Sequence, residues 1–344
     1  MIFIWYINKL TFLVIKLLFI MKQRDLSIDI LKFIAVIAIT NSHMELLYGK
    51  YSVLATGGAI GDVLFFFASG FTLFMGGVKS FDNFYKRRIN RIYPTVLAWA
   101  IVSCLIFGRD WNIISILLYG GGWFVSCIMI YYVVLYFVRR YFVEHLKMVL
   151  VLSFLISIGL YFVYNDGYQY NMYGATYYKW IHYFIYMLQG AMMGLYSKQN
   201  AIKVKNGWIE LGNTFVCVLL FYMFCSFKNS ETWNIVQVLS LIPLYGVVHY
   251  LYRLCNANGI KKFYKEKKLG WCMNAIGGLC LEVYLVQSCL FTDKLNSIFP
   301  LNIPIIFIEI VLFAYMVRCL ARIWAQTFKD NDYDWKEVIR VVPK

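Results

Sequence analysis

Long apolar segments recur along almost the whole chain, and short segments between them carry most of the charged residues. About 20 apolar residues in a helix cross a bilayer core of about 30 Å. Only helices and closed barrels satisfy their backbone hydrogen bonds in lipid, and unbroken apolar runs indicate helices. The predicted spans are 28–47, 58–78, 93–109, 113–138, 148–165, 179–197, 209–227, 234–252, 272–291 and 303–325. The pattern predicts an all-α, polytopic integral membrane protein with about ten transmembrane helices.

Composition supports this class, because 61% of the 344 residues are hydrophobic and only 15% are charged. Residues 1–20 form an apolar extension that contains two lysines and lacks a small-residue cleavage site, so they are a poor signal peptide. An interfacial helix is one interpretation of them. We favour a natural start at Met21, which would leave 21–325 as the membrane domain and 326–344 as a cytoplasmic tail.

The net charge of +15 first suggests a nucleic-acid partner, but its distribution argues against one. The basic residues gather in alternate loops, around 22–24, 79–91, 139–147, 198–205 and 253–268, and from 318 onward. Such alternation is the positive-inside pattern of membrane proteins. It predicts a multi-pass protein of the cell membrane, with the start of the first span and the C-terminus in the cytoplasm and the lipid bilayer as a partner.

The first predicted span carries ionisable residues along one face. Lys32 and His43 are eleven residues apart, so a helix that turns about 100° per residue points them within roughly 20° of each other. Asp29 lies near the same stripe, three residues before Lys32. Charged groups in a bilayer cost roughly 2.5–3.5 kcal/mol each, so they usually face a protein interior or a water-filled cavity. The stripe therefore needs an explanation, which is either a functional site or polar packing between helices.

Several motifs follow this stripe in a recognisable order. They are GDVLFFFASGF (61–71) in the second span, FYKRRINRIYP (84–94) in the basic segment after it, GGWFVSCIMIYY (121–132) and GGLCLEVYLVQSCLF (277–291). Together with the acidic, basic and histidine positions of the first span, they resemble acyltransferase family 3, a family of integral membrane acyltransferases. The resemblance covers nearly the whole chain from Met21 to about residue 325.

The resemblance implies a ten-helix enzyme that takes an acyl group, usually acetyl, from cytoplasmic coenzyme A. The implied acceptor is a hydroxyl on an extracytoplasmic or lipid-linked glycan. Two positions depart from the family: Arg usually stands where this chain has Lys32, and many members have His at the position of Gln287. A lysine offers a point charge where an arginine would offer a bidentate fork. The resemblance thus makes acetyl-CoA the expected donor. No metal is expected, because no metal-ligand spacing stands out in the sequence.

His43 is the candidate general base, because imidazole can take a hydroxyl proton near neutral pH. A polar packing histidine is the alternative. Lys32 and Asp29 have two open interpretations: they shape the donor tunnel, with Lys32 attracting a phosphate or the thioester oxygen, or they form a buried ion pair that sets helix packing.

Arg88 and Arg91 are one helical turn apart, so both can face one ligand. Arg87 reinforces their charge. Arginines bind phosphate groups well, so we expect these residues to hold the phosphates of coenzyme A. Membrane topology alone is the competing explanation of the cluster.

Further candidate pocket residues are Asp62, Ser69, Trp123, Glu282 and Gln287. Asp62 lies at a depth similar to that of His43 and either orients it, contacts the acceptor or sits in interfacial water. Ser69 belongs to a Ser-Gly pair that favours close helix packing. Glu282 is an acid near the bilayer centre, which is by default a functional-site hypothesis.

A transporter of a glycan precursor or small organic acid would also need ionisable residues inside the membrane. Transporters commonly show internal repeats or helices broken by Pro and Gly. No repeat is evident, and the chain has only five prolines. A non-catalytic scaffold is disfavoured by His43 and the arginine pair. These features favour an enzyme, and the resemblance implies an O-acyltransferase, most simply an O-acetyltransferase of polysaccharide or other cell-envelope glycan.

Overall fold

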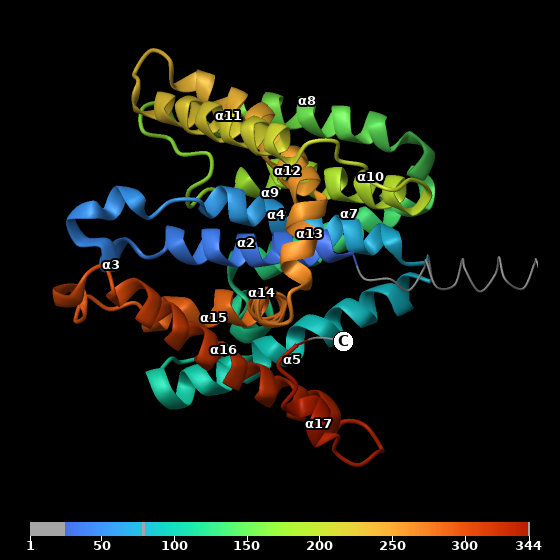
Figure 1. Ribbon diagram of the computed structural model, residues 1–344, viewed down its shortest axis with the longest axis vertical. Coiled ribbons are helices and arrows are strands. Elements are labelled where there is room, and N and C mark those ends of the chain that lie inside the picture. Colours follow the sequence, from blue (N-terminus) through green and yellow to red (C-terminus); the bar gives the residue numbers. More distant parts are fainter. Residues whose placement is uncertain (1–24, 78–79, 343–344) are drawn as a thin grey trace, which may run out of the picture.

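The computed structural model describes residues 25–77 and 80–342, and every regular element within them is helical (Figure 1). The predictions about residues 1–20 and a start at Met21 lie outside these residues. The α-helices are α2 (Leu26–Ser42), α3 (Glu45–Tyr48), α4 (Gly58–Met75), α5 (Phe81–Phe107), α6 (Ile113–Tyr119), α7 (Gly122–Tyr141), α8 (Leu146–Tyr164), α9 (Lys179–His182), α10 (Phe184–Gln199), α11 (Gly207–Ser226), α12 (Leu241–Cys255), α13 (Asn258–Lys265), α14 (Lys267–Gly278), α15 (Cys280–Leu290), α16 (Asn302–Thr327) and α17 (Trp335–Val338). The 3-10 helices are η1 (Gly49–Leu54), η2 (Val143–His145), η3 (Phe227–Asn229), η4 (Asn234–Ser240) and η5 (Asn296–Ile298). The all-α prediction is confirmed.

Among the described residues, seven helices are long and apolar enough to cross a membrane, and up to nine spans result if each of two bent pairs counts as one. The predicted polytopic membrane protein is confirmed, but the number ten is not. The predicted span 179–197 is the missing one, because α10 has 16 residues and is too short to count. Half of the residues of α10 are buried inside the protein.

Both bent pairs interrupt spans that the apolar pattern shows as continuous. Helix α2 and the following turns Glu45–Leu54 meet at 64°, and Lys268–Gly278 and Cys280–Leu290 meet at 73°. The second bend follows a pair of glycines, which are common sites of helix kinks. Gly277 also packs against α2, since a Cβ there would lie 3.0 Å from the backbone nitrogen of Phe33. Both breaks lie on helices that contribute to the candidate site.

Three layers of helices are visible in Figure 1. Helices α8, α11 and α12 form the upper layer, α2 and α4 cross the middle beside α10, and α5 and α16 form the lower layer. The most extensive contact is between α4 and α10. The middle layer is therefore packed on both sides, and α2 has neighbours in α4, α12, α14 and α15.

We expect Gly190→Ala to destabilise this central packing, because a Cβ on Gly190 in α10 would lie 2.0 Å from the carbonyl oxygen of Phe67 in α4. Overpacking of this kind typically costs about 1–3 kcal/mol. Gly212→Ala in α11 is the matched control, because a Cβ there meets nothing within 4 Å and alanine is the better helix former. Thermal unfolding in detergent measures both variants, and equal melting temperatures for the two would contradict the account.

Helix α5 begins at Phe81, whereas the apolar pattern predicted a span from 93. Residues 81–92 include several charged side chains, and the Lys and Arg residues among them are good helix formers. Pro94 is accommodated inside the helix. Arg88 and Arg91 consequently lie on a continuous helix, where residues three apart share a face.

Candidate active site

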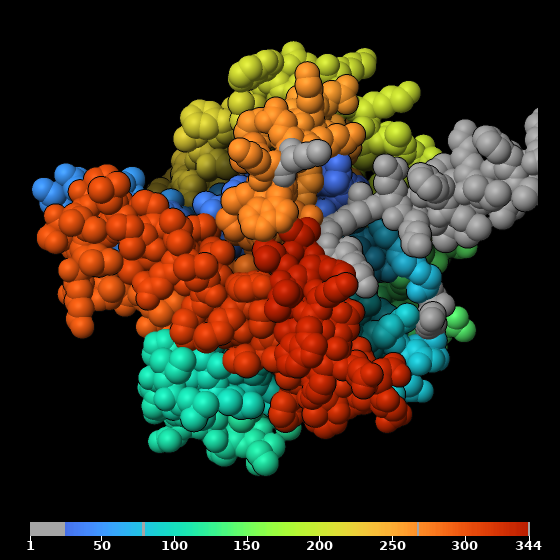
Figure 2. Space-filling model, turned by 60° about the horizontal axis from the view of Figure 1, so that its bottom comes forward, coloured from blue at the N-terminus to red at the C-terminus, as the bar shows by residue number. Residues whose placement is uncertain are grey.

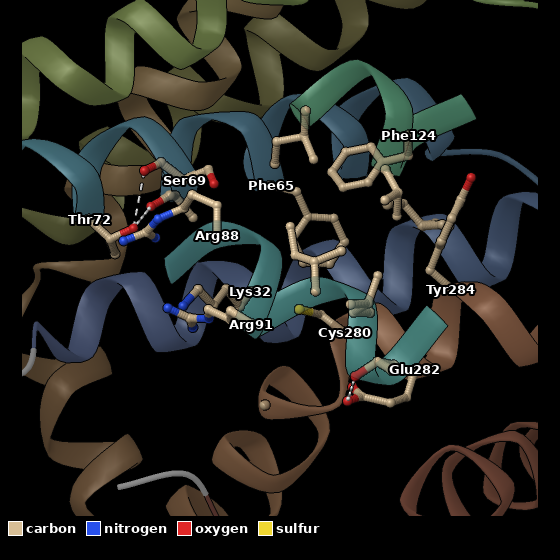
Figure 3. Close-up of a pocket in the computed structure, with 18 of the residues that line it drawn as sticks. Lys32, Phe65, Ser69, Thr72, Arg88, Arg91, Phe124, Cys280, Glu282 and Tyr284 are labelled. Atoms are coloured by element: carbon tan, nitrogen blue, oxygen red, sulfur yellow. Dashed lines mark hydrogen bonds between the residues drawn. The ribbon is translucent and has the colours of Figure 1, made fainter. Parts of the chain in front are cut away.

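A cavity of about 190 Å³ lies among α2, α4, α5, α7, α14, α15 and α16 (Figure 3). Its polar lining residues are Lys32, Ser69, Thr72, Arg88, Arg91, Thr95, Tyr132, Glu282, Tyr284 and Arg318. In Figure 3, Lys32, Arg88 and Arg91 lie together at one end, while Phe124 and Tyr284 lie at the other. We call the first of these the basic end. Its concentration of cations suits an anionic ligand.

Arg88 is held at the basic end by aromatic rings. Its guanidinium carbon lies 5.5 Å from the ring centre of Phe84 and 5.7 Å from that of Tyr132, which is within cation–π range. The Tyr132 hydroxyl is 2.9 Å from that of Ser69. The buried Nε of Arg88 has no hydrogen-bond partner in the described part of the chain. Arg88 is therefore oriented while keeping a donor for a ligand.

The other two predicted arginines differ in position. Arg91 lines the cavity with Arg88. Arg87 does not line it, and its Nε donates to the carbonyl oxygen of Asn83 at 3.0 Å on an exposed face of α5. The structure therefore brings together the R-x-x-R pair and separates Arg87 from it.

Glu282 and Arg318 form a bidentate ion pair inside the cavity wall. Arg318 Nη2 lies 2.6 Å from Glu282 Oε2, and Arg318 Nε lies 3.1 Å from Oε1. Arg318 also donates to the carbonyl oxygen of Gly278 at the α14–α15 break, and the Thr95 hydroxyl lies 3.4 Å from Glu282. Sequence reasoning found Glu282 but counted Arg318 among the topology signals. The position of Arg318 well inside an apolar run was the available signal.

The predicted stripe on α2 runs along the cavity and past its end. Lys32 and Ile39 line the cavity, and they are seven residues apart on one face of the helix. His43 follows one turn after Ile39, at the C-cap of α2, and is exposed. Asp29 lies outside the lining and is buried beside α14, where a Cβ on Gly277 would come within 3.2 Å of its carbonyl oxygen. Lys32 and His43 thus mark opposite ends of the site.

A second polar group lies at the His43 end. The Lys179 ammonium is 3.9 Å from the ring centre of Trp123, which stacks on Tyr183 at 5.8 Å. Tyr183 donates to Asp62 Oδ2 at 3.4 Å. Lys179 interacts electrostatically with both Asp62 and His43. The sequence analysis did not single out Lys179. The observed partner of Asp62 is Tyr183.

The remaining predicted residue, Gln287, is buried on α15 outside the cavity lining. Its Oε1 has no hydrogen-bond partner among residues 25–77 and 80–342. No three His, Cys, Asp or Glu side chains within those ranges come together as a metal site.

The cavity is lined in part by helices that are long and apolar enough to span a membrane. With cations at one end and a histidine beyond the other, it is suited to group transfer from an anionic carrier. Comparison with protein families agrees, because a family model described as an acyltransferase domain matches residues 25–324. The chain therefore belongs to acyltransferase family 3, as its motifs predicted. No curated protein and no solved structure matches it. Family membership supports a membrane acyltransferase, which requires an acyl donor and an acceptor.

Proposed function

We propose that this protein transfers an acetyl group from acetyl-CoA to a hydroxyl of a cell-surface or lipid-linked glycan. The observation that carries the proposal is that the cations and the histidine lie at opposite ends of the site. Lys32, Arg88 and Arg91 line one end of the cavity, and His43 lies one turn of α2 beyond Ile39 at the other. Coenzyme A carries phosphates on one end and the thioester on the other, so its charge distribution matches this direction.

In the proposed reaction, Arg88 and Arg91 hold the phosphates while the pantetheine arm enters the cavity. The acceptor hydroxyl approaches from the His43 end. Its oxygen bonds to the acetyl carbonyl carbon as His43 takes its proton. The tetrahedral intermediate then collapses, the carbon–sulfur bond breaks, and the leaving thiolate takes the proton from His43. Neutral His43 is regenerated, and the products are the O-acetylated glycan and coenzyme A.

Two further residues receive roles in this proposal. Lys179 lies beside Trp123 and interacts with His43, so it contributes positive charge where the carbonyl oxygen becomes negative. Asp62 accepts a hydrogen bond from Tyr183 and so sets the position of the Tyr183 and Trp123 rings beside Lys179. The proposed location is the cell membrane, with the basic end facing the cytoplasm as the positive-inside pattern favours.

Comparison of surface glycans from wild-type and deletion strains tests the proposal. Mass spectrometry should show glycan species that are one acetyl group lighter in the deletion strain, and plasmid-borne wild-type protein should restore them. Identical glycan masses in all strains would contradict the proposed acceptor class.

The arginine pair provides a sharper test of donor binding. Arg88→Gln and Arg91→Gln should each raise the KM for acetyl-CoA by about tenfold, since each removes a charge-assisted hydrogen bond to phosphate. Arg87→Gln is the matched control, because Arg87 is an adjacent cation that does not line the cavity. Initial rates in membranes at varied acetyl-CoA measure the effect. An equal loss in all three variants would favour topology as the role of the cluster.

A further inference from the structure

The cavity is too small for the whole proposed donor. Its volume of about 190 Å³ is below the 300–1,000 Å³ typical of pockets that hold drug-sized ligands. It suits an acetyl group and a narrow pantetheine arm. The adenosine 3′-phosphate of acetyl-CoA would therefore have to bind outside it, beyond the basic end.

An open cleft lies between the α13–α14 turn and the C-terminal segment 329–342. It has a volume of about 410 Å³, and its lining includes Lys265, Glu266, Trp271, Asn274 and Arg340. Figure 2 shows the red C-terminal segment lying against the orange surface of α13 and α14. The bend beneath the cleft is tightly packed, because a Cβ on Gly270 would lie 1.8 Å from the carbonyl oxygen of Tyr264.

Two helices connect this cleft to the cavity. On α14, Asn274 lines the cleft and Gly278, one turn further, lines the cavity. On α16, Arg318 lines the cavity, and Arg322, one turn further, donates to the carbonyl oxygens of Glu337, Val338 and Arg340. The C-terminal segment is thereby anchored one helical turn from the cavity lining, and α14 contributes residues to both the cleft and the cavity.

The cleft has the groups that a phosphorylated nucleoside needs. Trp271 is 55% exposed, and an exposed aromatic face can stack on a base. Lys265 and Arg340 supply cations for a phosphate, and the guanidinium of Arg340 makes no hydrogen bond or ion pair within the described part of the chain. The Glu266 carboxylate can accept from an adenine amino group or a ribose hydroxyl.

From this arrangement, and resting on the proposed function, we propose that the cleft binds the adenosine 3′-phosphate of acetyl-CoA. Trp271 stacks on the adenine, and Arg340 and Lys265 bind the 3′-phosphate. The phosphates nearer the pantetheine arm lie toward Arg88 and Arg91. The C-terminal segment is thus part of the donor site.

A series of three donors tests this assignment: acetyl-CoA, acetyl-dephospho-CoA without the 3′-phosphate, and acetyl-pantetheine without the nucleotide. Arg340→Gln should lower kcat/KM for acetyl-CoA by about tenfold, toward the wild-type value for acetyl-dephospho-CoA, and leave the latter donor unaffected. Trp271→Ala should lower kcat/KM for both nucleotide donors and leave acetyl-pantetheine unaffected. Lys336→Gln, an exposed cation on α17 outside the cleft lining, is the control.

Equal losses with all three donors, or an unchanged preference for acetyl-CoA in both variants, would overturn the assignment. A binding titration of purified wild-type and Arg340→Gln protein with unacetylated CoA and dephospho-CoA distinguishes a failure of the cleft assignment from a failure of the proposed function. If no donor supports transfer but Arg340→Gln still loses the discrimination between these ligands, only the proposed function fails. If wild-type protein binds both ligands equally, the cleft assignment fails by itself.

Discussion

The His43→Ala variant should lose at least about 100-fold in the rate of acyl transfer, the lower bound of the usual contribution of a general base. The KM for acetyl-CoA should change little, because the proposed phosphate contacts are at the basic end. The abundance of the protein should also be unchanged, since His43 is exposed at the end of α2. Initial rates in membranes with matched protein levels measure both parameters.

His145→Ala is the matched control, because His145 is also exposed at a helix end but lies in the η2 turn before α8. It should retain the wild-type rate. Added imidazole should partly restore His43→Ala if the missing function is proton transfer. Full activity of His43→Ala, or equal losses in both histidine variants, would remove His43 from the mechanism.

Arg318→Gln should destabilise the protein strongly, because it leaves the Glu282 carboxylate buried at 4% exposure without its ion-pair partner. Breaking a buried pair by removing one member typically costs about 3–5 kcal/mol. The double variant Glu282→Gln, Arg318→Gln should recover much of this loss, since two amides can hydrogen-bond without an unpaired charge. Thermal unfolding in detergent of the wild type, the two single variants and the double variant gives the four stabilities that a double-mutant cycle requires.

Glu309→Gln serves as the control for this cycle, because Glu309 is an acid on α16 that is exposed and has no described ion pair. It should unfold close to the wild-type temperature. Strictly additive effects of Glu282→Gln and Arg318→Gln would mean that the two side chains are not energetically coupled, and the ion pair would not be the element that holds α15 to α16.

The apolar periodicity was sufficient for the fold class. In lipid, every backbone N–H and C=O group needs a hydrogen-bond partner within the protein, and a long unbroken apolar run meets this need as an α-helix. The periodicity could not show the bends after α2 and after Gly278, because both lie inside stretches whose hydropathy is high enough for one continuous span. It also placed the start of α5 at 93, since helix α5 begins in a charged segment with no apolar pattern. Hydropathy reports what contacts lipid, and these features depend on contacts between helices.

The candidate site was partly predictable for a similar reason. The spacing of Lys32 and Ile39 and of Arg88 and Arg91 is local, so helix geometry alone puts each pair on one face. The Glu282–Arg318 pair joins two helices, and the Lys179–Trp123 contact joins two others. No spacing in the sequence encodes either contact. Arg318 was therefore grouped with the basic topology residues and Lys179 was not singled out, although both lie at the candidate site.

Membrane vesicles supplied with acetyl-CoA labelled in the acetyl group test the central claim most directly. Vesicles with the wild-type protein should place the label on glycan, and vesicles with His43→Ala or without the protein should not. Transport of an unmodified glycan precursor or organic acid without labelling of glycan would contradict the account, as would equal labelling by wild-type and His43→Ala vesicles.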